Sequence, residues 1–286
     1  MGSQTWLITG ASSGLGLELA LAAAENGDTV IASSRTPEKI GHLAERGILA
    51  ARLDQSEPLA QIKADVQTIL DTHGRVDFVV NCAAYVQTGI LEDLTPVETE
   101  EQFNTNVFGA LNVYRAVLPS LRKQRSGTLI TIGSMAAWFA DAGASVYNAS
   151  KAALRILSLG LAKEIEPLGI RHLLVEPARF RTELLAPDGN YRTSNGRDGI
   201  ADYGEISQRV FAAVASESGN QPGDPGKAAK VLYKIIKGSC GLNGKPLPDF
   251  LPLGSDAVDE ISKAAHNALN ICQEWEQIAR STDFAQ

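Results

Sequence analysis

The chain contains few of the residues from which metal centres and disulfide frameworks are built. Its 286 residues include three cysteines and four histidines. They are scattered, without a Cys-x-x-Cys pair or a histidine cluster. These absences argue against a zinc site, a disulfide-bonded scaffold and a mechanism based on histidine. We therefore expect a protein without a bound metal.

The chain also lacks long apolar runs and an excess of positive charge. No stretch approaches the roughly 20 apolar residues that a membrane-spanning helix needs, and the start, Met1-Gly2-Ser3-Gln4, does not resemble a signal segment. The net charge of -7 argues against nucleic-acid and anionic-membrane partners. We expect a soluble, cytoplasmic protein that binds a small molecule.

The sequence alternates short apolar runs with helical patterns. The runs at 6–9, 29–32, 48–53, 76–80, 128–132 and 170–175 predict strands. Helices are predicted at about 17–27, 37–46, 57–73, 97–123, 145–166, 205–217 and 226–237. Such alternation is typical of an α/β fold of Rossmann type, a doubly wound parallel sheet with helices on both faces. No repeat or linker divides the chain, so one domain over residues 1–286 is expected.

Three glycines lie at the first junction between a strand and a helix. Gly10, Gly14 and Gly16 follow directly after the first strand. Glycine permits a tight turn and a close approach of backbone to a pyrophosphate, while a helix N-terminus offers N–H groups and a partial positive charge. The junction predicts a nucleotide phosphate site, although an ordinary turn between strand and helix can have the same spacing.

Arg35 follows the second strand, where a dinucleotide-binding fold selects its cofactor. An acidic residue there accepts a hydrogen bond from the ribose 2′-hydroxyl, whereas a basic residue suits a 2′-phosphate. The segment Ser33-Ser34-Arg35 contains no acid. It favours NADP(H) over NAD(H), with the alternative that Arg35 only forms ion pairs with the following helix.

Tyr147 and Lys151 are four residues apart in a predicted helix, and Ser134 lies thirteen residues before the tyrosine. Residues at i and i+4 share one helix face. An ammonium beside a phenol lowers the phenol pKa from about 10, which would make Tyr147 a proton donor or acceptor near neutral pH. For the pair alone, an exposed aromatic beside a solvated charge is the alternative.

A polar, glycine-bearing stretch follows the sixth strand from residue 178 to about 204. A loop of this length in a compact domain is more often a binding segment than a connector, and we expect a substrate lid over about 178–217. The apolar residues expected to line a substrate pocket, with core or lid packing as the alternative, are Trp138, Phe139, Leu184, Leu185, Tyr191 and Tyr203.

The region after residue 238 is expected to form a C-terminal extension. Leu251-Pro252-Leu253-Gly254 lies in this region. A last amphipathic helix follows, with Ser255 as its N-cap.

The ordered set of motifs resembles the short-chain dehydrogenase/reductase family, from Thr9 to the C-terminal helix. Thr9-Gly10-x-x-x-Gly14-x-Gly16, Asn81-Cys82-Ala83-Ala84, Asn106-Val107-Phe108-Gly109, Ser134, Tyr147 and Lys151 carry the resemblance. The turns at 221–225 and 251–254 resemble those of members with an extended C-terminus. The resemblance implies an oxidoreductase that pairs, as a homodimer or homotetramer, through the helices that hold Asn106 and Lys151.

The resemblance implies roles for specific residues. The implied catalytic residues are Asn106, Ser134, Tyr147 and Lys151. The implied NADP(H) contacts are Gly10, Ser12, Ser13, Gly14, Leu15 and Gly16 at the phosphates, Arg35 at the 2′-phosphate, Asp54 at the adenine, Asn81 and Ala83 at the ribose, Tyr147 and Lys151 near the nicotinamide ribose, and Pro177, Phe180 and Thr182 near the carboxamide and pyrophosphate.

The implied reaction is reversible reduction of a ketone or aldehyde in an apolar small molecule by NADPH. Tyr147 would exchange the proton, Lys151 would lower its pKa, and Ser134 would polarise the carbonyl. Asn106 would hold a water that relays protons to Lys151. Two alternatives remain open, namely an NADP(H)-binding scaffold or sensor, and a non-redox cyclisation or dehydration in the same pocket. The complete set of catalytic residues argues against the scaffold.

Two positions depart from the family pattern. Ala84 and Ala178 stand where glycine is usual. Since neither position is expected to need a positive φ, we expect a slight reshaping of the groove and retained cofactor binding.

Overall fold

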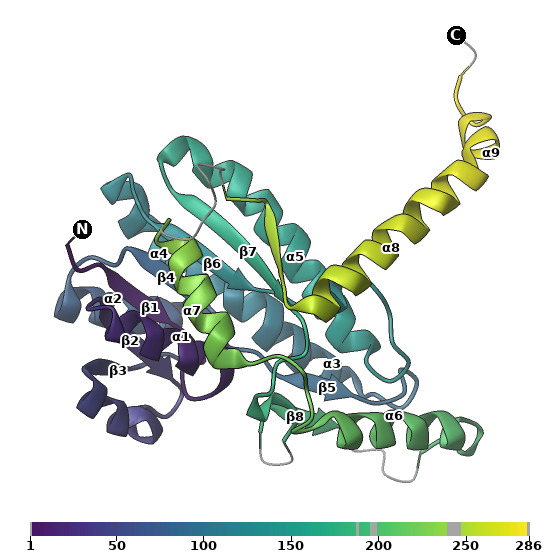
Figure 1. Ribbon diagram of the computed structural model, residues 1–286, viewed down its shortest axis with the longest axis horizontal. Helices are drawn as coiled ribbons and strands as arrows, with labels where there is room; N and C mark the ends of the chain where they lie inside the picture. Colours follow the sequence, from purple (N-terminus) through teal and green to yellow (C-terminus); the bar gives the residue numbers. More distant parts are fainter. Residues whose placement is uncertain (1, 187–188, 195–198, 239–246, 285–286) are drawn as a thin grey trace.

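Figure 1 shows the computed structural model, which describes residues 2–186, 189–194, 199–238 and 247–284. Its main strands are β1 Thr5–Ile8, β2 Thr29–Ser34, β3 Ile48–Arg52, β4 Phe78–Asn81, β6 Thr128–Ile132, β7 Arg171–Pro177 and β9 Phe250–Leu253. Within these residues, the seven strands form one sheet in the order β3-β2-β1-β4-β6-β7-β9. Every neighbouring pair is parallel. The predicted doubly wound Rossmann-type sheet is therefore confirmed.

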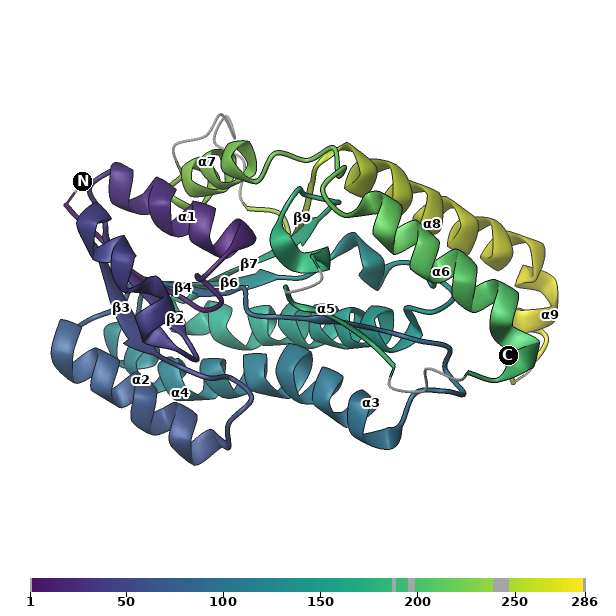
Figure 2. The same cartoon turned by 90° about the horizontal axis from the view of Figure 1, so that it is seen from below.

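Helices cover both faces of the sheet (Figures 1 and 2). The α-helices are α1 Gly14–Glu25, α2 Leu59–His73, α3 Pro96–Phe103, α4 Ala110–Gln124, α5 Ser145–Ile165, α6 Gly204–Glu217, α7 Pro225–Ile236, α8 Ser255–Glu274 and α9 Glu276–Arg280. The apolar side chains of α1 and α7 pack in one core, and those of α2 and α4 pack in the core on the opposite face. In the described residues, no helix is both long and apolar enough to cross a membrane.

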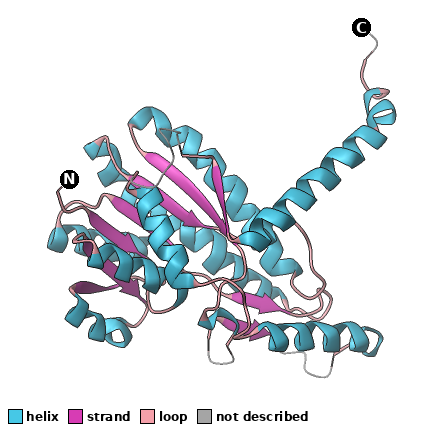
Figure 3. Cartoon of the chain, viewed as in Figure 1, coloured by secondary structure: helices cyan, strands magenta, loops and turns pink. Residues whose placement is uncertain are grey.

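Shorter helical turns connect these elements. They are η1 Pro37–Arg46, η2 Asn104–Gly109, η3 Met135–Ala137, η4 Glu166–Leu168, η5 Glu183–Leu185 and η6 Ala201–Tyr203. Two three-residue strands, β5 Val86–Thr88 and β8 Tyr191–Thr193, form a second, small parallel sheet. Figure 3 shows this pair apart from the main sheet.

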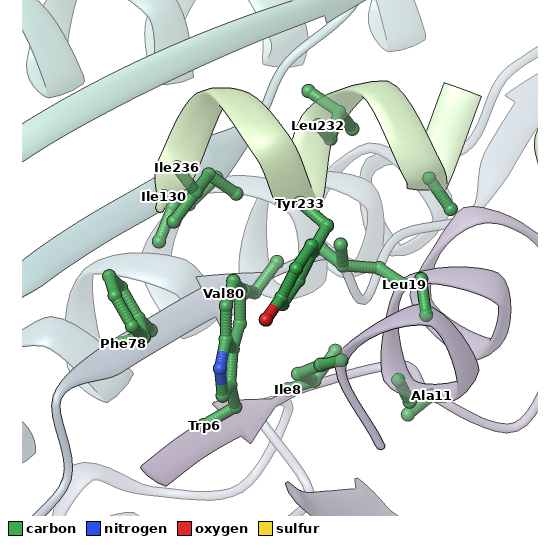
Figure 4. Packing of buried hydrophobic residues seen from close by; sticks show 14 of the residues in the cluster. Trp6, Ile8, Ala11, Leu19, Phe78, Val80, Ile130, Leu232, Tyr233 and Ile236 are labelled. Atoms are coloured by element: carbon green, nitrogen blue, oxygen red, sulfur yellow. The ribbon is translucent and has the colours of Figure 1, made fainter. Parts of the chain in front are cut away.

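The core beneath α1 and α7 is organised around aromatic rings and one buried carboxylate. The Trp6 ring stacks on Tyr233 with centroids 5.7 Å apart and lies 4.3 Å from Phe78 (Figure 4). Asp28 accepts hydrogen bonds from Trp6 Nε1 at 2.9 Å, from the Tyr233 hydroxyl at 3.1 Å and from Lys237 Nζ at 3.0 Å. These bonds attach the C-terminal end of α7 to the first two strands.

Three sequence predictions are wrong in detail. Residues 251–254 were predicted as a turn, but Phe250–Leu253 is the seventh strand. Pro252 signals a turn, yet a proline is tolerated in β9 because this strand lies at the sheet edge. The N-cap of α8 is Gly254, with a φ of 96°, and Ser255 is already helical. The helical pattern predicted at 97–123, broken only by Gly109, is divided by the whole π-helical turn η2, which ends at that glycine.

The Asp28 carboxylate yields a test of stability. Burial opposes its ionisation, but the bonds from Gln4 N, Trp6 and Lys237 prevail and lower its pKa below the ordinary 3.8. Asp28→Asn should therefore reduce the free energy of unfolding at pH 7 by roughly 3 kcal/mol. The contribution of Asp28 is fully present above pH 3.8 and is lost as the pH falls through the lowered folded pKa.

Urea unfolding at pH 7 and at about pH 3 measures this contribution. The difference between wild type and Asp28→Asn should shrink in acid. Glu276→Gln, which alters an exposed ion pair with Arg280, is the control and should leave stability unchanged within about 0.5 kcal/mol. An Asp28→Asn protein as stable as the wild type at pH 7 would contradict the role of this network.

Candidate active site

A cavity of about 440 Å³ lies at the carboxyl ends of the central strands. The segments that follow β1, β2, β3, β4, β6 and β7 all contribute to its wall. This edge is where an open parallel sheet binds its ligand, because successive loops diverge to opposite faces there.

Most of the predicted site residues meet in this cavity. Those that line it are Gly10, Ser12, Ser13, Gly14, Leu15, Arg35, Asp54, Ala83, Ser134, Tyr147, Lys151, Pro177, Phe180 and Thr182. Gly16, Asn81 and Asn106 lie behind the wall. Their contacts, described below, position the residues that line the cavity.

The glycine turn after β1 allows two segments of backbone to approach closely. Gly10 has a φ of 64°, and a Cβ there would lie 2.6 Å from the Cα of Ala83. A Cβ on Gly16 would lie 2.6 Å from the carbonyl oxygen of Gly10. A side chain on Gly10 would push the turn away from the segment after β4, and a side chain on Gly16 would push α1 away from the turn. Gly16 therefore acts through packing.

The N-terminus of α1 fits a phosphate group. Ser13 is the N-cap but makes no side-chain cap hydrogen bond, and the first turn carries no acidic residue. Ser12, Ser13, Gly14 and Leu15 line the cavity at this point. Main-chain N–H groups at an uncapped helix N-terminus attract anions, so the residues present fit a dinucleotide pyrophosphate.

Thr9 and Asn81 hold the ends of β1 and β4 together. The Thr9 hydroxyl accepts hydrogen bonds from the backbone N–H groups of Cys82 at 3.1 Å and Ala83 at 3.2 Å. It also donates to Asn81 Oδ1 at 3.3 Å, and Asn81 Nδ2 donates to the Ala110 carbonyl at 2.9 Å. Asn81 thus anchors the floor of the cavity to α4.

Arg35 and Asp54 lie at one end of the cavity. Arg35 is exposed and has no ion-pair partner among the described residues. Asp54 Oδ1 accepts from the Ser56 N–H at 2.9 Å and the Ser56 hydroxyl at 2.6 Å. An unpaired guanidinium at the mouth suits an added phosphate.

Asn106 lies in η2 and connects three segments of the site. Its Oδ1 accepts from Tyr85 N at 3.1 Å, and its Nδ2 donates to Tyr85 O at 3.0 Å and to the Ser150 hydroxyl at 3.2 Å. Ser150 in turn donates to the Tyr147 carbonyl at 2.7 Å. The side chain therefore ties the segment between β4 and β5 to the helix of Tyr147.

Gly109, the last residue of η2, allows this turn to approach the segment after β3. A Cβ on Gly109 would collide with the Gln55 carbonyl oxygen. Gln55 is buried, and its Nε2 donates to the carbonyls of Ala83 at 2.7 Å and Thr105 at 2.9 Å. The helix of Asn106 and the end of β3 are thereby packed backbone against backbone.

Ser134, Tyr147 and Lys151 converge at the other end of the cavity. Ser134 is the N-cap of η3, and its hydroxyl accepts from Ala136 N at 3.1 Å. Lys151 Nζ donates to the Ile132 carbonyl at 3.2 Å and lies 5.9 Å from the centroid of the Tyr147 ring. The Ser134 hydroxyl lies close enough to Tyr147 to favour the ionised form of the phenol. The convergence of a phenol, a hydroxyl and an ammonium is thus present.

Burial changes the acidity of the two titrating groups. Burial raises the pKa of Tyr147 above 10, and the nearby Ser134 hydroxyl lowers it only in part. Burial also lowers the pKa of Lys151 to about 8, with Cys82 opposing the change. The expectation that Lys151 brings the tyrosine pKa down is not met, because desolvation of the phenolate outweighs the favourable interactions. At neutral pH Tyr147 is a protonated acid.

Half of the aromatic and aliphatic residues predicted for a substrate pocket line the cavity. Phe139, Leu184 and Leu185 do so, whereas Trp138, Tyr191 and Tyr203 do not. Trp138 Nε1 instead donates to buried Glu176 at 2.8 Å, and the Tyr191 and Tyr203 hydroxyls bond to Thr88 and Glu92. For these three residues, the alternative to a place in the substrate pocket, namely packing in the core or lid, is therefore correct.

Several residues at the end of the cavity that holds Tyr147 were not predicted from the sequence. Gln221 is 2% exposed and lines the cavity, and its Oε1 has no hydrogen-bond partner in the structure. Asp141 and Glu217 also line the cavity, and Glu217 pairs with Arg179 at 3.3 Å. The sequence signal for Gln221 was the turn at 221–225. A turn signal marks a change of chain direction but does not show that a side chain in the turn faces the cavity.

Ala84 and Ala178 both line the cavity. Among the described residues, Arg125 is the non-glycine residue with a positive φ. The expectation that neither alanine needs a positive φ is therefore confirmed.

Comparison with known proteins identifies the family. A family model described as short chain dehydrogenase matches residues 4–192. The chain belongs to the short-chain dehydrogenase family. This short-chain dehydrogenase is 30% identical over 282 residues to the oxidoreductase BOA17 of Botryotinia fuckeliana, covering 97% of this chain and 98% of that protein.

Two solved structures extend the comparison. A short-chain dehydrogenase from Streptomyces avermitilis is 36% identical to this one, with a TM-score of 0.86 and coverage of 99% of both chains. A gluconate 5-dehydrogenase from Burkholderia cenocepacia, in complex with NADP and tartrate, is 29% identical, with a TM-score of 0.62 and coverage of 65% of this chain and 75% of that one. The likeness to the first includes the C-terminal region.

The position of Asn106 in this short-chain dehydrogenase can be tested by stability. Asn106→Leu keeps the size of the side chain but removes three buried hydrogen bonds and leaves the Tyr85 N–H unpaired, while the Tyr85 carbonyl keeps its bond from Gln102. We expect a loss of roughly 2–4 kcal/mol in the free energy of unfolding, measured by urea titration. Asn112→Leu, at a half-buried position whose side chain bonds only to exposed Arg115, is the control. Equal effects of the two substitutions would contradict the anchoring role.

Proposed function

We propose that the protein is an NADPH-dependent reductase of ketones or aldehydes, working reversibly on the corresponding alcohols. The observation that supports this most directly is one continuous cavity with Arg35 at one end and Tyr147, Ser134 and Lys151 at the other. The arrangement suits an extended dinucleotide whose phosphate and reactive ends need different chemistry. The family membership supports oxidoreductase activity.

The cofactor proposal is based on the phosphate sites. Ser12, Ser13, Gly14 and Leu15 would hold the pyrophosphate at the N-terminus of α1, and Arg35 would pair with the 2′-phosphate. Asp54 would contact the adenine, Ala83 the ribose, and Phe180 and Thr182 the nicotinamide side. NADP bound to the similar gluconate 5-dehydrogenase is consistent with this choice.

The mechanism assigns one task to each residue. Bound NADPH supplies the hydride for the carbonyl carbon. Tyr147 donates its proton to the carbonyl oxygen as negative charge develops there, which suits a phenol that burial keeps protonated. Ser134 donates a hydrogen bond to the same oxygen, and Lys151 stabilises the phenolate that remains. Asn106 holds the helix of Tyr147 in place, and the opened turn of η2 is the proposed site of a water that returns a proton through Lys151.

The substrate end favours an uncharged molecule. Its wall combines apolar Val86, Phe139 and Leu184 with charged groups. Arg179 and Arg192 are paired with Glu217 and Glu101, whereas the carboxylate of Asp141 has no ion-pair partner among the described residues. An anionic substrate would be repelled by this carboxylate. We therefore propose a neutral ketone or aldehyde with apolar substituents.

The catalytic assignment is tested with Tyr147→Phe. The variant should lower kcat for reduction of an uncharged aryl ketone by roughly 10²- to 10⁴-fold, because the proton donor is lost. Binding of NADPH, followed by fluorescence titration, should change little. Tyr203→Phe is the control, since its hydroxyl bonds to Glu92 outside the cavity.

The same assay separates the alternatives. If wild type binds NADPH but oxidises none of it with a set of uncharged aryl ketones, the reductase assignment is wrong. The protein would then be a scaffold, a sensor or a catalyst of a non-redox reaction. If Tyr147→Phe turns over as fast as wild type, Tyr147 is not the acid. A keto acid carboxylate with the same aryl group should react more slowly than the neutral ketone.

The cofactor assignment is tested with Arg35→Asp. The dissociation constant for NADPH should rise by roughly 10- to 100-fold, because one charge-assisted bond is replaced by repulsion. The constant for NADH should change by less than about 3-fold. Arg46→Asp makes the same change of charge at an exposed ion pair with Glu25 and should alter neither. An equal loss for both cofactors would reject the 2′-phosphate role.

A further inference from the structure

A buried carboxylate lies behind the cavity wall at the end of β7. Glu176 directly precedes Pro177, and its side chain is fully buried. Trp138 Nε1 donates a hydrogen bond to Glu176 Oε2 at 2.8 Å. Arg155 Nε lies 3.2 Å from Glu176 Oε1, in an ion pair that lacks the alignment of a hydrogen bond. Two elements of the site, the turn η3 and the helix α5, are therefore attached to one carboxylate.

The first attachment fixes the turn that begins at Ser134. Trp138 ends this turn, and its N–H donates to the Met135 carbonyl at 3.1 Å. A turn of 3₁₀ type is tight, so a shift of its last residue moves its first. On the other side of Ser134, the Gly133 N–H donates to the Val175 carbonyl at 2.7 Å. Ser134 thus lies between two attachments to the end of β7.

The second attachment fixes the helix of the proposed proton donor. Arg155 follows Lys151 by four residues, so the two side chains project from the same face of α5. The guanidinium of Arg155 lies 4.1 Å from the centroid of the Trp138 ring and 5.5 Å from that of Phe250. A guanidinium that contacts two rings and a carboxylate has little freedom to move. It therefore holds α5 against η3.

The start of the C-terminal helix covers this network. Met135, which follows Ser134, packs with Ala257 and Ile261 in the first turns of α8, before the helix projects from the body (Figures 1 and 2). The Trp138 ring packs against the same cluster. Electrostatic contacts are stronger where water is excluded, so the cover strengthens the hold of Glu176 on its two partners.

Stability alone does not account for a charged pair at this place. Taking two charges out of water is costly, and well-packed apolar residues are often at least as stabilising. A hydrogen bond and an ion pair differ from apolar packing because they hold their partners in one direction. Direction is important for Ser134, since a donor to a developing oxyanion must lie roughly 2.7–3.1 Å from that oxygen.

We propose that Glu176 is a positioning residue, which sets the place of the Ser134 hydroxyl relative to the Tyr147 phenol. It acts through the turn that ends at Trp138 and through Arg155 on α5. Neither Glu176 nor Trp138 lines the cavity, so both act through other residues. The inference rests on the proposed function, in which Ser134 and Tyr147 bond to the same substrate oxygen.

Trp138→Phe tests this role, because it removes the bond to Glu176 and keeps an aromatic ring beside Arg155. The kcat for reduction of an uncharged aryl ketone should fall by roughly 10-fold, a part of the 10²- to 10³-fold that loss of an oxyanion donor costs. KM and the dissociation constant for NADPH should change by less than about 2-fold, because the donor acts in the transition state. Trp275→Phe, at an exposed position outside the cavity, is the control and should leave kcat unchanged.

The same substitution in a Ser134→Ala background separates positioning from packing. With the Ser134 hydroxyl removed, Trp138→Phe should lower kcat by less than about 2-fold, because the two residues act as a unit. Single-turnover measurements with enzyme in excess over NADPH make the slow double variant measurable. Urea unfolding shows that each variant is folded.

Each outcome of this cycle decides the proposal. Equal factors in the two backgrounds overturn the positioning role, and so does an unchanged kcat when Trp138→Phe is the single substitution. In both cases turnover by wild type leaves the proposed function intact. A wild type that oxidises no NADPH with these ketones rejects the proposed function, and the positioning role with it.

Discussion

The close approach of two backbone segments is the constraint on which the site depends. Where β1 ends, Gly10 leaves no room for a side chain against Ala83, and the Thr9 hydroxyl bonds to the amides after β4. β1 and β4 are neighbours in the sheet, and β1 lies between β2 and β4. The approach of these turns shapes the floor on which α1 presents its N-terminus to the cavity, and every other residue of the site is placed relative to this floor.

Burial sets the chemistry at the opposite end. The same desolvation acts in opposite directions on the two titrating groups, keeping Tyr147 protonated and lowering the pKa of Lys151 to about 8. A buried acid next to a buried ammonium provides a proton and a positive charge where a carbonyl oxygen would gain electrons. The Asn106 side chain, through Ser150, holds the backbone of this helix in position.

The sequence predicted the fold, and most of the site residues that it indicated line the cavity, because both follow from local patterns. Apolar runs alternating with helical periods require a parallel sheet, and a parallel sheet brings the residues after each strand to one edge. Predictions failed where two distant segments cooperate. Residues 251–254 were predicted as a turn from the resemblance alone, whereas Phe250–Leu253 forms β9, which tolerates Pro252 because it lies at the sheet edge. The pairing of β5 with β8 joins three-residue strands that have little signal of their own.

The sequence by itself determined the class of fold, the order of its elements, the glycine turn, and the identity of the phenol, ammonium and hydroxyl that meet in the cavity. Folding decided what surrounds them. Whether a phenol ionises depends on how much water the packed chain removes, and whether Trp138 lines a pocket depends on the position of Glu176. The exposure of residues 262–280 was also beyond sequence reasoning, since the amphipathic pattern of the last helix is typical of a packed helix and only the folded chain shows that its own body covers little more than Ala257 and Ile261.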